Sequence, residues 1–216
     1  MIRKPALLFV AICLSCSAAL AVASPISTTP EVFAPGTISG PLGEACPAFT
    51  PDGNTVYFDV GSMILVSHRV HDVWSKPEVA PFSGQWLDHD PTMAPDGSYL
   101  VYVSNRSVAG DGKPLDATVQ GKIRPGKGGN LWRVDRKGNG WGDPVHLPAA
   151  VNASDRTYAP SIAADGSVYF IRPGNDGKFH IFISAYRNGA YQPAEQVAVG
   201  DPTAQTHDPA IAPDQS

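Results

Sequence analysis

The sequence predicts an all-β protein, a β-propeller of four-stranded blades. Gly and Pro each number 21 among 216 residues, and without a collagen-like period that content favours tight turns between short strands. A short phrase also recurs at intervals that suit one blade. Hydrophobic residues make up 43% and charged residues 17%, which argues against a disordered or membrane-embedded chain. The net charge of -4 argues against a nucleic-acid partner, since such proteins carry a basic face.

The recurring phrase has four copies. They are CPAFTPDGNTVYFDV (46–60), DPTMAPDGSYLVYVS (90–104), APSIAADGSVYFIR (159–172) and DPAIAPDQS (208–216). The turn aspartates, Asp52, Asp96, Asp165 and Asp214, are 44, 69 and 49 residues apart. In such a turn Pro presets φ, Asp accepts a hydrogen bond from the backbone, and Gly takes a positive φ.

Each phrase predicts the strands of one blade. An inner strand begins at the proline, because proline cannot donate to a ladder. The second strands are TVYFDV, YLVYVSN and SVYFIR, and the third are MILVSHR (63–69), NLWRVDR (130–136) and HIFISAYR (180–187), all rich in β-branched and aromatic residues. An aromatic before a proline, at Trp74, Trp141 and Tyr191, precedes each outer strand. We expect these rings to pack between blades.

The repeats occupy residues 31–216, with blades at 45–84, 88–151 and 157–199 and the start of a fourth at 206–216. EVFAPGTISG (31–40) is similar to PEVAPFSG (77–84), which predicts an outer strand without a blade of its own. The sequence therefore predicts three complete blades plus an unpaired first and last strand, an incomplete ring. Such a ring would come from a fragment, or a symmetric dimer would complete it, because open edges invite pairing.

Residues 1–23 predict a signal peptide, followed by an extension at 24–30. Arg3 and Lys4 precede the apolar run ALLFVAICLSCSAAL, and AVA at 21–23 supplies the small residues of a cleavage site. The alternatives are an uncleaved membrane segment or a lipid anchor at Cys16. Cys46 would then be the single cysteine of the mature chain, unable to form an internal disulfide, and we expect it to be a small buried residue. This pattern predicts a bacterial periplasmic or secreted protein.

The PDG phrase with a tyrosine-bearing strand and a downstream W-x-x-P resembles the TolB-type propeller repeat of bacterial envelope proteins. The resemblance covers roughly residues 31–216. It implies the fold and an envelope location, while propellers in general serve both binding proteins and enzymes.

The residues just before each inner-strand proline should surround the mouth of the propeller channel. The candidate ligand-binding residues there are Glu44, His89, Asp90, Tyr158, His207 and Asp208. Imidazoles and carboxylates at one rim could hold a divalent cation or carry out acid–base chemistry. The alternative is structural: Asp and His would cap strand starts and bond to neighbouring blades.

The longest departure from the repeat is residues 107–129, between the second and third strands of the second blade. This places it on the same face as the mouth, and long loops in compact folds are often functional. Its cations are Lys113, Lys122, Arg124 and Lys127, which could grip an anionic ligand such as a polysaccharide or a peptide carboxylate. The alternative is a mobile solvated loop. GKGG is not a phosphate loop, because the required Ser or Thr and helix do not follow.

The sequence contains no G-x-S-x-G, H-E-x-x-H or paired-cysteine zinc motif, and it assigns no catalytic residue. We therefore favour a periplasmic binding module for an envelope protein or glycan, with no cofactor beyond a divalent cation that the mouth could hold. The alternatives are a hydrolase or lyase acting on carbohydrate or peptide at the mouth, or the propeller part of a larger peptidase truncated at Ser216.

Overall fold

The computed structural model describes residues 29–201 and 204–216, so the predicted signal peptide lies outside the described residues. The chain divides into two units, residues 1–31 and 32–216, and all strands of the described residues belong to the second. Among the described residues there is no helix suited to crossing a membrane.

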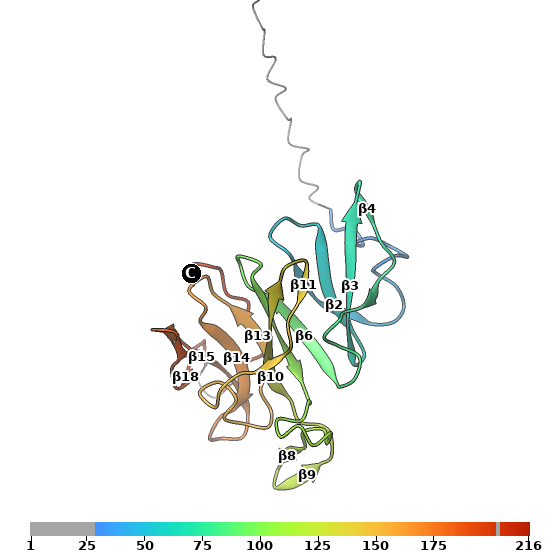
Figure 1. The fold of residues 1–216 in the computed structure, drawn as a ribbon. Coiled ribbons are helices and arrows are strands. Elements are labelled where there is room, and N and C mark those ends of the chain that lie inside the picture. Colours follow the sequence, from blue (N-terminus) through green and yellow to red (C-terminus); the bar gives the residue numbers. More distant parts are fainter. Residues whose placement is uncertain (1–28, 202–203) are drawn as a thin grey trace, which may run out of the picture. The chain divides into compact units, whose positions relative to one another are not determined.

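Three antiparallel sheets follow one another along the second unit (Figure 1). The first contains β1 (Glu44–Phe49), β2 (Thr55–Val60), β3 (Met63–Val70), β4 (Val73–Trp74) and β5 (Glu78–Val79). The second contains β6 (Asp88–Met93), β7 (Tyr99–Ser104), β10 (Asn130–Lys137), β11 (Gly140–Trp141) and β12 (Val145–His146). The third contains β13 (Tyr158–Ile162), β14 (Val168–Pro173), β15 (Phe179–Ser184) and β18 (Glu195–Gln196). Two separate hairpins join β8 (Ala117–Val119) to β9 (Lys122–Arg124) and β16 (Tyr186–Arg187) to β17 (Ala190–Tyr191). The predicted second and third strands are confirmed, whereas the outer strands are only two residues long.

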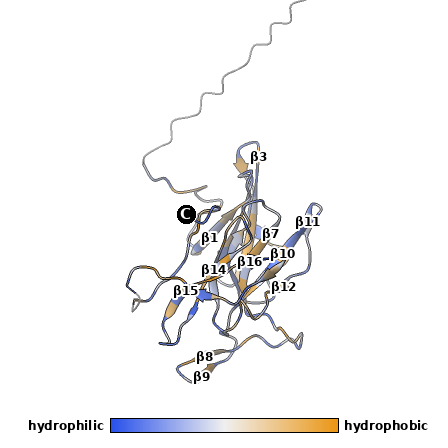
Figure 2. Ribbon diagram, turned by 90° about the vertical axis from the view of Figure 1, so that its left-hand side faces the viewer, coloured by the Kyte–Doolittle hydropathy of each residue, from blue (hydrophilic) through white to orange (hydrophobic). Residues whose placement is uncertain are grey.

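The second sheet is buried on both faces, because alternate residues of β7 point to opposite neighbours. Leu100 and Tyr102 pack against Tyr57 and Ile64 of the first sheet. Val101 and Val103 pack with a cluster from the third sheet that includes Phe170. Colouring by hydropathy shows the same apolar strands inside the unit (Figure 2). The continuous apolar run of YLVYV thus reflects a strand with a sheet on either side.

The predicted packing of the aromatics between sheets is confirmed at Trp141. Its ring lies edge-on to Tyr57 of the first sheet and to Phe82, which follows β5, with centroids 5.7 and 5.6 Å apart. Its indole N–H donates to the Tyr57 hydroxyl at 3.1 Å. Burying a large ring together with its polar atom in this way joins the two sheets specifically.

The four predicted turns form as their side chains dictate. The residue after each turn aspartate has a positive φ, and its N–H donates to the carbonyl three residues earlier, as Gly53 does to Thr50 at 2.8 Å and Gln215 to Ala212 at 2.9 Å. Each aspartate accepts the N–H two residues later, as Asp96 does from Ser98 at 2.9 Å. Gln215 takes the left-handed conformation (φ 66°), where the other three copies have glycine.

A repeated β-bulge at the inner-strand prolines was not predicted. The ladders gain one extra residue between Ala45 and Ala48, between His89 and Thr92, and between Tyr158 and Ser161. The residue before each proline has a positive φ of 46–50°; the four are Cys46, Asp90, Ala159 and Asp208. A bulge leaves one residue out of the ladder, so the missing N–H of proline costs no hydrogen bond there.

The prediction of an outer strand at 31–40 is wrong. The segment is a turn, in which Thr37, Ile38 and Ser39 all donate their N–H groups to the Ala34 carbonyl, with one isolated bridge between Pro35 and Ser39. Its buried residue is Ile38, which packs on Val56 and Phe58. The turn forms because Gly36 takes a φ of 76°, and the similarity to 77–84 was one of composition alone.

The predicted last strand at 206–216 forms no ladder either. The segment still attaches to the third sheet: Ala164 donates to the Pro213 carbonyl at 2.8 Å, and Ile211 donates to the Ser161 hydroxyl at 3.0 Å. It keeps the positive φ before the proline, at Asp208, and the turn of the repeat, but it pairs with no strand in the described part of the chain.

Candidate functional site

The inner strands β1, β6 and β13 are neighbours: β6 contacts both of the others. Their bulges therefore lie next to one another across the sheets. Three positions recur in each copy, counted back from the proline: the residue three before it, called the start position, the residue two before it, and the residue directly before it, called the bulge residue. The candidate site is built from these positions.

Asp90, the bulge residue of the second sheet, links all three sheets. Its carboxylate accepts the Ala159 N–H of the third sheet at 3.1 Å and the Cys46 thiol of the first at 3.3 Å. Its own N–H donates to Asp59 on β2 at 3.4 Å. This arrangement matches the structural alternative, in which an aspartate at this position bonds to neighbouring blades.

His89 and Asp90 form a partly exposed ion pair, with Nδ1 and Oδ2 3.3 Å apart. Burial acts to lower the pKa of His89, but the hydrogen bond and charge of Asp90, with the charges of Asp59 and Asp88, outweigh it and raise that pKa. Burial acts to raise the pKa of Asp90, and the interaction with His89 outweighs this and lowers it. Each group therefore stabilises the charged form of the other.

An aromatic row runs across the sheets from this pair. It consists of His89, Tyr158, Phe179 and His207, with successive ring centroids 6.0, 5.9 and 6.0 Å apart. His89 and Tyr158 are stacked at 27°. The rings come from the second sheet, the third sheet and the C-terminal segment, and they are half-buried or, for His207, exposed. The row is thus partly open to solvent, most fully at His207.

The hairpin β8–β9 lies at the lower end of the unit in Figures 1 and 2. The segment that contains this hairpin is hydrogen-bonded to Tyr158 of the row. The Tyr158 hydroxyl donates to the Lys127 carbonyl at 3.3 Å. Asp155, three residues before Tyr158, accepts the Thr118 N–H at 2.6 Å, and its carbonyl accepts the Gly129 N–H at 2.8 Å. Segment 107–129 therefore lies beside Tyr158, one of the predicted site residues.

Comparison with solved structures decides the fold. A TolB structure from Agrobacterium tumefaciens matches 82% of this chain and 52% of its own, with 17% sequence identity and a TM-score of 0.51. The chain has a TolB-like fold.

Two further matches have lower TM-scores. TolB from Acinetobacter baumannii is 17% identical over 68% of this chain and 31% of its own, with a TM-score of 0.46. A gluconolactonase from Xanthomonas campestris is 13% identical over 79% and 67%, with a TM-score of 0.36. The chain thus spans about half or less of the length of the TolB structures. No family model and no curated protein matches the sequence.

Within this TolB-like fold, two predicted residues stand apart from the row. Glu44 occupies the start position, and its carboxylate turns to the backbone N–H groups of Glu44, Gly40 and Leu42, whose hydrogen bonds lower its pKa. Asp208 is exposed, and no hydrogen bond or ion pair among the described residues involves its carboxylate. The repeat equivalence of Asp90 and Asp208 therefore does not extend to their contacts.

The four predicted loop cations, Lys113, Lys122, Arg124 and Lys127, are all exposed. No ion pair within residues 29–201 and 204–216 involves them. Two of them, Lys122 and Arg124, lie on β9 itself. They remain available to an anion that reaches the row.

Sequence reasoning missed Phe179 and Arg156. Phe179 opens β15 and lies between Tyr158 and His207, while the Arg156 guanidinium lies over it, 5.5 Å from the ring centroid. Neither belongs to the repeated phrase. The available signal was an aromatic at the start of a third strand, on the face where the second-to-third loops gather.

Within the described residues, the group whose ligand atoms converge is Cys46, Asp59 and Asp90, all within 4.8 Å of one another, and it differs from the predicted histidine–carboxylate set. Cys46 is exposed, which corrects the expectation of a buried residue. Although the residue is exposed, its sulfur is partly buried, and this burial is the first cause that raises the pKa of Cys46; the charges of Asp90 and Asp59 follow. A protonated thiol can donate its hydrogen bond to Asp90. It is a poor ligand for a hard cation, which prefers oxygen ligands.

Proposed function

We propose that this chain is an exported, periplasmic β-propeller module, with its three sheets as blades, that binds an anionic glycan of the cell envelope along the aromatic row. The observation that carries the proposal is the row itself, four rings joined at regular spacing across two sheets and the C-terminal segment. Flat rings offer apolar faces on which successive sugar units can stack. Residues 1–23 and the TolB-like fold support the envelope location.

The negative charge of the ligand follows from the hairpin. Four exposed cations belong to the segment whose backbone is bonded to Tyr158 and Asp155. Arg156, which lies 3.9 Å from the Asp155 carboxylate, adds a fifth cationic side chain beside Phe179. Cationic side chains around a rigid platform attract an anion and accelerate its encounter, with a strong dependence on salt.

Calorimetric titration of the purified protein with an oligogalacturonate tests the proposal, with cellohexaose as the neutral glycan and poly-glutamate as the acidic peptide. Phe179→Ala should weaken oligogalacturonate binding about three- to tenfold, the value of one aromatic contact. Lys122→Glu with Arg124→Glu should weaken it further at low salt and less at high salt. The matched controls are Phe49→Ala and Lys76→Glu, a partly exposed ring and a cation of the first sheet.

Equal binding of cellohexaose would contradict the charge requirement. Binding of poly-glutamate in place of both glycans would assign the row to an acidic protein partner. Unchanged binding by Phe179→Ala, with an unchanged melting temperature, would show that the ligand does not lie on the row.

A further inference from the structure

A second candidate site lies on the first sheet, on the face turned away from the second. Val56 and Phe58 point to this face, since the alternate residue Tyr57 packs into the core shared with the second sheet. The 33–39 turn covers part of it and inserts Ile38. A pocket of about 320 Å³ remains beside that side chain, within the range typical of small-ligand sites.

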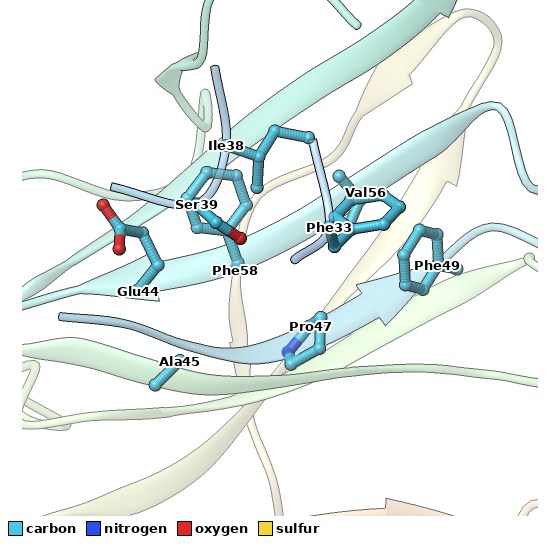
Figure 3. A pocket seen from close by; sticks show the side chains of 9 residues that line it. All are labelled: Phe33, Ile38, Ser39, Glu44, Ala45, Pro47, Phe49, Val56 and Phe58. Carbon is cyan, nitrogen blue, oxygen red and sulfur yellow. The ribbon is translucent and has the colours of Figure 1, made fainter. Parts of the chain in front are cut away.

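The lining is mostly apolar, and its polar side chains are Ser39 and Glu44. Figure 3 shows Phe33 and Phe49 at one end, Pro47 and Ala45 along one wall, and the Glu44 carboxylate at the other end. Phe33 and Phe49 stand edge-on to each other, 5.5 Å between centroids. Both rings also contact Trp74, at 5.4 and 6.2 Å, so three aromatics hold this end in place.

Glu44 is the only ionisable group among the residues that line this pocket. Backbone N–H groups of Glu44, Gly40 and Leu42 keep its pKa below the ordinary value, so it is negatively charged at neutral pH. No ion pair in the described part of the chain neutralises it. An occupant that fills the apolar end and places a positive charge near Glu44 would satisfy both ends together.

We propose that this pocket binds a small amphiphilic cation, an aromatic or aliphatic body carrying one protonated amine, with the body against Phe33 and Phe49 and the amine at Glu44. The site is separate from the aromatic row: it shares no residue with it and involves the opposite charge. Charge complementarity at Glu44 favours this ligand over a neutral apolar molecule and over an anion.

Three probes with one shape test the charge requirement: phenylpropylamine, phenylpropanol and phenylbutyrate, which are cationic, neutral and anionic. Titrations are followed by methyl NMR of isoleucine-labelled protein. The Ile38 methyl reports on the pocket, and the Ile162 methyl, in the core between the second and third sheets, is the internal reference. The amine should bind about two- to fivefold more tightly than the alcohol, as an exposed charge pair allows, and the carboxylate should bind most weakly.

Glu44→Gln keeps an oxygen for the backbone donors and should remove the preference for the amine while the alcohol binds as before. Glu78→Gln, an exposed carboxylate on β5, is the matched control and should preserve it. Ser39→Phe, which fills the pocket from its lining, should abolish binding of all three probes without lowering the melting temperature.

Equal affinities for the three probes, or binding that leaves the Ile38 methyl unshifted, would overturn the proposal. Light scattering measures the oligomeric state and so tests the alternative that a second copy of the chain occupies this face. A wild-type dimer that binds no probe, together with a monomeric Ser39→Phe variant, would assign this face to a second copy of the chain.

Discussion

Asp90→Ala should destabilise the protein by about 2–4 kcal/mol, because it removes an acceptor shared by three sheets. The carboxylate accepts the Ala159 N–H at 3.1 Å and the Cys46 thiol at 3.3 Å, and it pairs with His89 at 3.3 Å. A hydrogen bond to a charged group contributes about 1.5–3 kcal/mol, and a partly buried N–H left without an acceptor costs about 1–3 kcal/mol. Asp90→Asn keeps one acceptor oxygen and should lose about half as much.

Asp208→Ala is the matched control, since Asp208 stands at the same repeat position with a φ of 46° against 50° for Asp90. Its exposed carboxylate makes no contact among the described residues, so the substitution should change stability by less than about 0.5 kcal/mol. Urea unfolding at constant pH measures both variants, with equal slopes confirming a common unfolded state. Losses within about 0.5 kcal/mol of each other would refute the bridging role of Asp90.

Three further predictions concern the row and the core. Because the pKa of His89 is raised in the folded protein, its contribution to folding stability is complete below the pKa of the unfolded state and is lost as the pH rises through the pKa of the folded state. Between about pH 6 and pH 8, the melting temperature of His89→Gln should therefore fall less than that of the wild type. Gly129→Ala would place its Cβ 2.2 Å from the Tyr158 ring, so it should lower both the melting temperature and oligogalacturonate affinity; unchanged values would mean that the ring moves freely. Leu100→Ala, at a fully buried position, should cost about 2–5 kcal/mol in urea unfolding, and a cost near zero would contradict the two-sided burial of β7.

The turns and central strands could be predicted because their causes are local. Asp52 and Gly53 form their turn through hydrogen bonds within five residues, and β2 is marked by a run of strand-forming residues, four of which are buried in succession. The turn at 31–40 could not be predicted, and the analogy with 77–84 gave an outer strand instead. Whether Ile38 enters a ladder or packs on Phe58 depends on the face of a sheet formed later in the chain.

The site was predicted in part for the same reason. His89, Tyr158 and His207 share one repeat position, two residues before the proline, so the repeat brings them to one row. Phe179 completes the row from the start of β15, outside the repeated phrase. The bulge at each proline was also beyond reach, because the left-handed φ of a non-glycine residue leaves no mark in the sequence other than the recurring proline.

The histidine imidazoles provide the most direct test of ligand binding along the row. Among the protein's six histidines, His89 and His207 lie at its two ends, while His68 and His146 belong to β3 and β12. In NMR spectra of histidine-labelled protein titrated with oligogalacturonate, the signals of His89 and His207 should shift together with one dissociation constant while those of His68 and His146 stay in place. Shifts confined to His68 and His146, or none at saturating oligogalacturonate, would contradict a glycan-binding row.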